Sequence, residues 1–173
     1  LIPTLLFGMW NVVYHHFNAI GIGATFFEQF LFGAIKVIPM VVVSYAVGLG
    51  IEFLFCVIKG HQIEEGYLVS GMLIPLIMPV DLPLWMLALS VAFAVIIGKE
   101  VFGGTGMNIF NPALLARAFA FFAYPTYMSG DKVWINTTGT EGMMAVDGFS
   151  GATALGEYAT TGVSQYSALD AFI

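Results

Sequence analysis

Charged residues are scarce in this sequence. Only 9% of its 173 residues are Asp, Glu, Lys or Arg, against about 25% in a typical soluble domain. Because 59% of the residues are hydrophobic and the mean hydropathy is +0.90, a soluble form would expose large apolar patches and aggregate. The composition therefore excludes an ordinary soluble domain and predicts a protein that lies mostly in a lipid bilayer.

Basic residues and cysteine are also few. Five basic and eleven acidic residues give a net charge of −6, without a basic cluster, so we expect no nucleic-acid partner. The single cysteine, Cys56, cannot form an internal disulfide and is expected to be an inert buried residue. We expect the sequence to be part of a longer protein, because Leu1 is not an initiating residue and a new apolar segment opens near the end.

The apolar runs fall into two classes. Two are long enough to cross a bilayer core, which needs about 20 residues: residues 1–22 and 32–58. Three later runs are too short to cross and are bounded or interrupted by Pro and Gly: residues 67–79, 84–98 and 113–124. Since lipid cannot pair irregular backbone, such segments must line a cavity enclosed by protein. Short, interrupted segments are typical of binding sites in membrane folds with broken helices.

Four of the charged residues in or beside these runs bear on the interpretation. Glu52 and Arg117 are isolated in apolar surroundings, and because a charge at membrane depth is expensive, each is expected to face a cavity or a partner. For Glu52 two interpretations stay open, a place beside a cation path and a side chain that faces the interface. Lys99 and Glu100 are adjacent and are expected at the membrane interface.

Residues 125–165 form a polar segment rich in Gly, Thr and Ser that must lie outside the hydrocarbon. Loops longer than about 12–15 residues are usually functional or disordered. Within it, residues 147–156 read DGFSGATALG, a stretch without histidine, cysteine or a basic residue. The sequence thus divides into transmembrane helices and broken half-helices over 1–124, this loop, and the start of a further transmembrane helix over 166–173.

Two motifs together carry a family resemblance. The run FGGTGMNIFNPALLARAFAFFAYP at residues 102–125, followed by DGFSGATALG, resembles the family that contains the B subunit of the Na⁺-translocating NADH:quinone oxidoreductase and the D subunit of the Rnf-type oxidoreductase. The tetrapeptide SGAT alone is a modest signal, but its combination with FGGTGMNIFNPA in this order is highly specific. The resemblance implies an all-α polytopic membrane protein with broken or re-entrant helices. It also implies the inverted-repeat architecture of urea and ammonium channels, of which this chain would hold about the first half.

In that family the threonine of SGAT carries FMN through a phosphoester bond, which a flavin transferase makes outside the cytoplasm. Thr153 is the matching residue. The resemblance therefore implies a multi-pass protein of the bacterial inner membrane, with residues 129–165 on the periplasmic side. An ordinary Ser-Gly turn is the alternative interpretation of the motif. Its other cofactor-binding candidates are Asp147, Ser150, Gly151 and Ala152.

The motif GGTGMNIFNPA is the second candidate site. Its glycines permit a positive φ or a close backbone approach, and Pro112 suits the first turn of a following half-helix. Asn108 and Asn111 offer amide donors and acceptors to a planar heterocycle. The family holds riboflavin without a covalent link in its membrane part, so the resemblance implies that these asparagines lie near it. The alternative is that both asparagines cap their own backbone.

The connection KGHQIEEG, residues 59–66, is the third. In the family it lies close to the site of quinone reduction, where a carboxylate could deliver protons. A solvated loop between helices is the alternative interpretation. The quinone-site candidates are Gly60, His61, Glu64 and Glu65.

The resemblance implies a subunit of a redox-driven sodium pump. Electrons from NADH would reach the FMN and riboflavin through partner subunits and then reduce ubiquinone, while Na⁺ is exported. Two alternatives are an Rnf-type complex, which exchanges electrons between ferredoxin and NAD, and a passive channel for urea-like solutes. The residues that would bind Na⁺ are not indicated by any motif.

Overall fold

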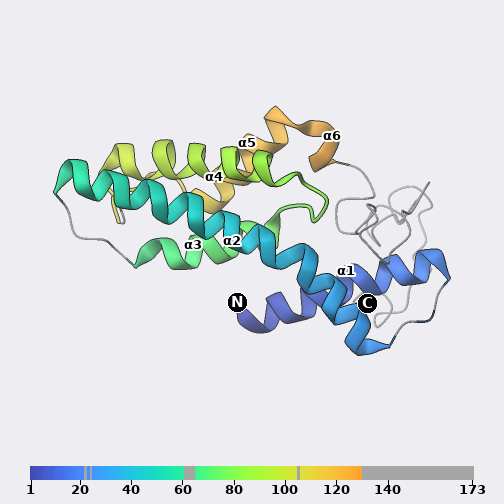
Figure 1. Cartoon of the computed structure of the whole chain (residues 1–173). Helices are drawn as coiled ribbons and strands as arrows, with labels where there is room; N and C mark the ends of the chain where they lie inside the picture. Colours follow the sequence, from blue (N-terminus) through green and yellow to red (C-terminus); the bar gives the residue numbers. More distant parts are fainter. Residues whose placement is uncertain (22, 24, 61–64, 105, 130–173) are drawn as a thin grey trace.

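The computed structural model describes residues 1–129 except 22, 24, 61–64 and 105, and this part is built of helices (Figure 1). They are α1 (Ile2–Ile20), α2 (Phe26–Lys59), α3 (Gly66–Ile77), α4 (Leu84–Gly98), the 3-10 turn η1 (Glu100–Phe102), α5 (Pro112–Ala123) and α6 (Pro125–Met128). The all-α prediction is confirmed for this part of the chain. The architecture of a urea or ammonium channel stays a prediction.

Two helical stretches in the described part are long and apolar enough to cross a membrane, α2 and Leu84–Phe102. The sequence predicts that 84–98 is too short, but η1 follows α4 and brings the stretch to 19 residues. The expected first span forms α1, also 19 residues long, yet it is not one of the two, because four polar side chains lie between positions 11 and 18. The helices α3 and α5 have 12 residues each, as short as predicted.

One narrow stripe of α2 is buried. Its members recur every three or four positions, which is one face of a helix: Gln29, Gly33, Val37, Met40, Ser44, Gly48 and Glu52. Small residues in the stripe let other helices approach closely. At Gly33 the backbone of α1 passes so near, at Met9, that no side chain would fit. Further along, α3 and α4 pack on the stripe (Figure 1).

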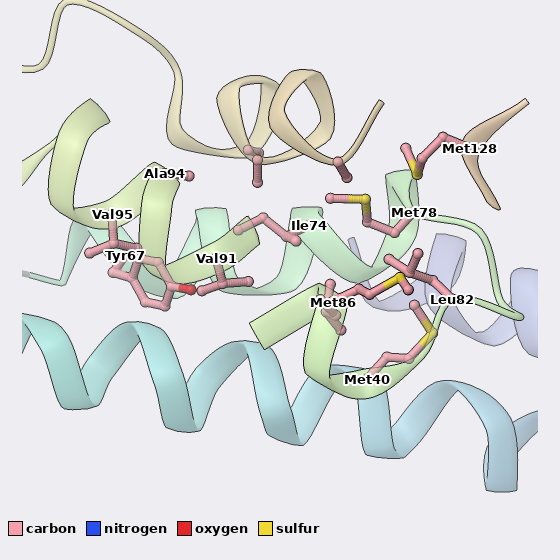
Figure 2. Packing of buried hydrophobic residues seen from close by; sticks show 14 residues of the cluster. Met40, Tyr67, Ile74, Met78, Leu82, Met86, Val91, Ala94, Val95 and Met128 are labelled. Atoms are coloured by element: carbon pink, nitrogen blue, oxygen red, sulfur yellow. The ribbon is translucent and has the colours of Figure 1, made fainter. Parts of the chain in front are cut away.

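The main apolar core lies between α2, α3, α4 and α5 (Figure 2). Alanines form the buried face of α5, where Ala113, Ala116 and Ala120 are fully enclosed, so α5 can approach α4 closely. Methionines, whose flexible side chains fill irregular gaps, occupy the part of the core that includes α6. They are Met40, Met78, Met86 and Met128.

Polar contacts join α2 and α3 where proline interrupts the backbone pairing of α3. Pro75 has no N–H, so the carbonyl of Gly71, four residues earlier, lacks its helical donor. The hydroxyl of Ser44 on α2 donates to that carbonyl at 2.8 Å. In return the hydroxyl of Tyr67 on α3 donates to the Ser44 carbonyl at 2.9 Å. The Tyr67 ring occupies the space that a side chain at Gly48 would need.

Helix ends gather at two opposite ends of this core. At one end α2 finishes, α3 begins and α4 turns into the connection to α5, and there the Lys59 ammonium donates to the Glu100 carbonyl. At the other end α4 begins and α5 finishes, with the rings of Trp85 and Tyr124 5.6 Å apart. The described chain leaves this second end through α6 and Ser129 (Figure 1).

Candidate functional site

The connection between η1 and α5, residues 103–111, has a backbone that only glycine adopts readily. The φ angles are 117° at Gly103, 100° at Gly104 and 88° at Gly106, values that side-chain-bearing residues rarely adopt. The N–H of Gly104 donates to the Lys99 carbonyl at 3.1 Å and so folds the chain back against the end of α4. The prediction that these glycines serve a positive φ is confirmed. We call residues 103–111 the Gly-rich connection.

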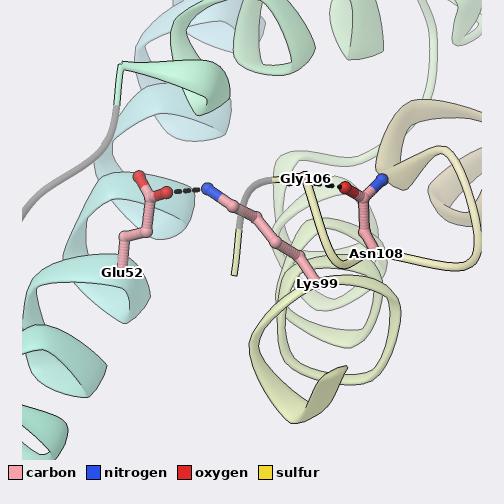
Figure 3. Close-up of polar contacts among 4 residues, drawn as sticks. All are labelled: Glu52, Lys99, Gly106 and Asn108. Atoms are coloured by element: carbon pink, nitrogen blue, oxygen red, sulfur yellow. Dashed lines mark hydrogen bonds and ion pairs between the residues drawn. The ribbon is translucent and has the colours of Figure 1, made fainter. Parts of the chain in front are cut away.

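The two asparagines of the Gly-rich connection both bind nearby backbone. The Oδ1 atom of Asn108 accepts from the Gly106 N–H at 3.2 Å (Figure 3), and its Nδ2 donates to the Phe110 carbonyl at 3.0 Å. The Oδ1 atom of Asn111 accepts from two N–H groups in the first turn of α5, at 2.9 and 3.4 Å. Asn111 therefore caps α5, which begins with Pro112 as the sequence predicts. Both amides shape the connection, and any contact with a ligand would be additional.

Apolar side chains surround this polar backbone. Met107, Ile109 and Phe110 of the Gly-rich connection are 71%, 69% and 53% exposed, and Val101 of the preceding η1 is also exposed. Bare glycine backbone, carboxamides and apolar side chains thus occur together in one short segment. A flat ring system with a polar edge and apolar faces needs this combination in a binding site.

A buried ion pair links α2 to the residue where α4 ends. Glu52 and Lys99 are 2% and 3% exposed, and their side chains are paired (Figure 3). The Lys99 ammonium also lies 5.9 Å from the centre of the Tyr67 ring. The second carboxylate oxygen of Glu52, Oε2, is buried and has no hydrogen-bond partner within the described part of the chain.

The ion pair decides one expectation and leaves another open. Lys99 and Glu100 are both buried, because the end of α4 packs against α2, and their place at the membrane interface stays a prediction. Glu52 does not face the interface, since its carboxylate meets Lys99 inside the protein. Sequence reasoning missed Lys99 as a site residue. The signal that could have found it is charge complementarity: the acid Glu52 lies deep in one apolar run, and the base Lys99 directly follows another.

Arg117 pairs the backbone at the end of a broken helix. Its guanidinium, on α5, donates to the carbonyl of Ile77, the last residue of α3. The last carbonyls of a helix lack helical donors and carry partial negative charge, so a cation there is favourable. The expectation that Arg117 faces a partner inside the protein is confirmed.

The quinone-site candidates are only partly within the described residues. Gly60 ends α2 with a φ of 70°, and its N–H donates to the Cys56 carbonyl at 2.8 Å. Glu65 is exposed and directly precedes α3. His61 and Glu64 lie outside the described residues. Gly60 adjoins the end of α2 and Glu65 the start of α3. These two helix ends lie at the same end of the core as the Gly-rich connection (Figure 1), an arrangement that the sequence does not predict.

The covalent-flavin motif lies outside the described residues, and so do the rest of the predicted loop from residue 130 to 165 and the predicted helix start at 166–173. Its assignment stays a prediction. The residues concerned are Asp147, Ser150, Gly151, Ala152 and Thr153. Within the described residues no group of three or more His, Cys, Asp or Glu side chains is placed to hold a metal ion.

A helix as short as α3 cannot cross a bilayer unaided. Two carbonyls of α3 that lack a helical donor are bound by side chains of neighbouring helices. The Ser44 hydroxyl donates to the Gly71 carbonyl, and the Arg117 guanidinium donates to the Ile77 carbonyl. Such pairing is what a bilayer demands wherever a helix is broken. Together with the two apolar helical stretches, it is consistent with a helical membrane protein. The family described as NQR2, RnfD, RnfE matches residues 1–173, and the chain belongs to it.

Three curated relatives share one name, that of the B subunit of Na(+)-translocating NADH-quinone reductase. The chain is 40% identical to that protein of Chromohalobacter salexigens, over 99% of this chain and 46% of the relative. It is 41% identical to that of Ectopseudomonas mendocina, over 99% and 47%. For Neisseria meningitidis serogroup B the identity is 42%, over 94% and 43%. The chain therefore spans a little under half the length of these relatives.

Proposed function

We propose that this chain is part of the membrane subunit of a redox-driven sodium pump. The subunit carries covalent FMN and riboflavin, and it passes electrons that come from NADH through partner subunits to ubiquinone, coupled to export of Na⁺. The observation that carries the proposal is an identity of 40–42% over 94–99% of this chain to relatives named as the B subunit of a Na⁺-translocating NADH-quinone reductase. Its partners are the other subunits, a flavin transferase and the bilayer of the bacterial inner membrane.

Thr153 is the proposed attachment point of FMN, through a phosphoester to its hydroxyl. Small neighbours, Gly151 and Ala152, leave the backbone around it bare, which suits a hydroxyl that another enzyme must draw into its own active site. The polar segment 129–165 is proposed to lie on the periplasmic side. The described chain leaves the core through α6 and Ser129, so this segment begins at the end of the core opposite to the Gly-rich connection.

Riboflavin is proposed to bind at the Gly-rich connection. The residues present fit it: glycine backbone without side chains, the carboxamides of Asn108 and Asn111, and the exposed apolar side chains of Met107 and Ile109. When bound, a flavin supplies one- and two-electron transfer. The protein's own task there is to hold the connection in shape, which the asparagine amides do by binding its backbone.

Ubiquinone is proposed to react near residues 60–65, where Gly60, His61, Glu64 and Glu65 are the candidates. A carboxylate on this connection can hand a proton to a quinone as it is reduced. The end of α2 and the start of α3, which Gly60 and Glu65 adjoin, lie at the same end of the core as the Gly-rich connection, which supports a short path between the riboflavin and the quinone.

Attachment of FMN is tested on denatured protein, where only covalent flavin remains. The purified complex should give a fluorescent band under ultraviolet light, and the peptide covering residues 147–156 should carry the mass of FMN less water. Thr153→Ala should abolish both signals. The matched control is Thr160→Ala, which removes a hydroxyl seven residues away and should keep them. An unmodified peptide from an intact complex made with the transferase contradicts the proposal.

The Rnf-type alternative shares the matched family, whose description includes RnfD. It predicts the same covalent flavin, so the band does not separate the two. Oxidation of NADH by the assembled complex does: a sodium pump of the proposed kind needs ubiquinone as acceptor, and an Rnf-type complex needs ferredoxin. A passive solute channel predicts no covalent flavin at all.

A further inference from the structure

Lys99 joins α2 to the Gly-rich connection through two different groups. Its side chain pairs with Glu52 on α2. Its carbonyl accepts the N–H groups of Phe102 and Gly104, at 3.2 and 3.1 Å, which are the bonds that turn the chain after α4. The next residue, Glu100, is also held by α2, because the ammonium of Lys59, the last residue of α2, donates to the Glu100 carbonyl. Two successive residues of the turn are therefore attached to α2.

A buried ion pair is a poor way to gain stability. The free-energy cost of removing two charges from water is often larger than the free energy that their attraction returns. Replacing such a pair with apolar residues of similar size commonly leaves a protein equally stable or more stable. Here the pair also leaves the Oε2 atom of Glu52 buried and without a partner in the described part, which adds to the cost. What the pair does provide is a fixed direction and distance between α2 and the turn.

We propose that Glu52 and Lys99 are positioning residues for a noncovalent flavin. Their ion pair fixes the start of the Gly-rich connection against α2, and thereby holds the connection in the shape that takes the flavin. The inference rests on the proposed function, because it needs a flavin at residues 103–111. It assigns neither residue a contact with the flavin.

The test uses the complete complex in its host membrane and the double variant Glu52→Gln/Lys99→Met, which removes both charges and keeps both sizes. Riboflavin released on denaturation is measured by chromatography and divided by the covalent flavin in the gel band. We expect this ratio to fall about tenfold, the lower end of what loss of an orienting contact costs at metal sites. The thermal midpoint of the complex and its covalent flavin should not change.

Two further variants serve as controls. Lys99→Arg keeps the charge and should keep the ratio within about twofold, since an arginine also pairs with a carboxylate. Lys36→Met removes a lysine that lies on α2, 16 positions before Glu52 in the sequence, and should leave the ratio unchanged.

Each remaining outcome overturns the inference in a recognisable way. If the double variant assembles and keeps the wild-type ratio, the pair does not position the site, although the flavin site stands. If the double variant fails to assemble while Lys36→Met assembles, the pair serves folding and not positioning. If the wild-type complex itself releases no riboflavin, the proposed riboflavin site is wrong and the inference falls with it.

Discussion

The variant Ser44→Ala tests whether a hydroxyl on α2 replaces the amide that Pro75 cannot supply within α3. The Gly71 carbonyl is buried, and its observed donor is Ser44 at 2.8 Å. A buried carbonyl that loses its partner costs about 1–3 kcal/mol, whereas hydrogen bonds between membrane helices average about 0.6 kcal/mol and reach about 1.7. Because no helical N–H can take over, we expect a loss near the upper part of the membrane range, about 1–2 kcal/mol of unfolding free energy.

The decisive measurement is a double-mutant cycle with Pro75→Ala. Alanine at position 75 restores an N–H four residues after Gly71, so the carbonyl regains a donor within its own helix. Ser44→Ala should therefore cost about 1 kcal/mol less in the Pro75→Ala background than in the wild type. Unfolding free energies are measured by denaturant titration of the purified protein in one detergent at one temperature.

A matched control removes a hydroxyl from the neighbouring position of α2. Tyr45→Phe loses a hydrogen bond to the Leu68 carbonyl, 2.6 Å long, but that carbonyl lies four residues before Met72, whose amide is available. The control should cost no more than about 0.5 kcal/mol, the low end for a hydrogen bond. If Ser44→Ala costs the same with Pro75 and with alanine at position 75, the hydroxyl does not replace the missing amide and the reasoning is wrong.

Two other contacts give predictions of the same kind. Gly48→Ala places a methyl group in the space of the Tyr67 ring and should lower the unfolding free energy by about 1–3 kcal/mol. The control is Gly50→Ala, which has open space around it and should be neutral or stabilising. Equal effects of the two variants on the unfolding free energy would contradict the packing described. Arg117→Met should lower the thermal midpoint by removing the cation from the Ile77 carbonyl, whereas Arg117→Lys should recover part of the loss; a midpoint that is indifferent to charge at 117 speaks against this contact.

Local rules were enough to predict where the helices break. The glycines at 103, 104 and 106 adopt the positive φ that their clustering indicates, and Asn111 with Pro112 starts α5 as an N-cap and first-turn proline do. These features depend on a few consecutive residues, so the sequence displays them directly. The prediction that the run 84–98 is too short to cross a bilayer was wrong, because the 3-10 turn η1 extends it. That turn has no strong local signal in the sequence before Gly103.

Pairing between distant elements could not be predicted in this way. Glu52 and Lys99 are 47 positions apart, and their meeting depends on how α4 packs along the stripe of α2. Sequence reasoning considered each charge alone and did not pair Lys99 with Glu52. For Asn108 it kept two interpretations open, and the structure shows the local one without testing the other. The positions of residues 60 and 65 relative to the Gly-rich connection likewise depend on the packing of whole helices.

The length of α2 has a consequence for depth in the bilayer. Its 34 residues rise about 51 Å at 1.5 Å per residue, against a hydrocarbon thickness of about 30 Å. Even at a tilt of about 40°, the upper limit for such helices, only about 39 Å fits inside. We expect the overhang at the first turns, which carry Glu28, since the helices around the Glu52 end form the apolar core. On that expectation α1, which crosses α2 at Gly33, lies near the lipid headgroups, where the exposed Asn18 would reach water while His16 stays buried.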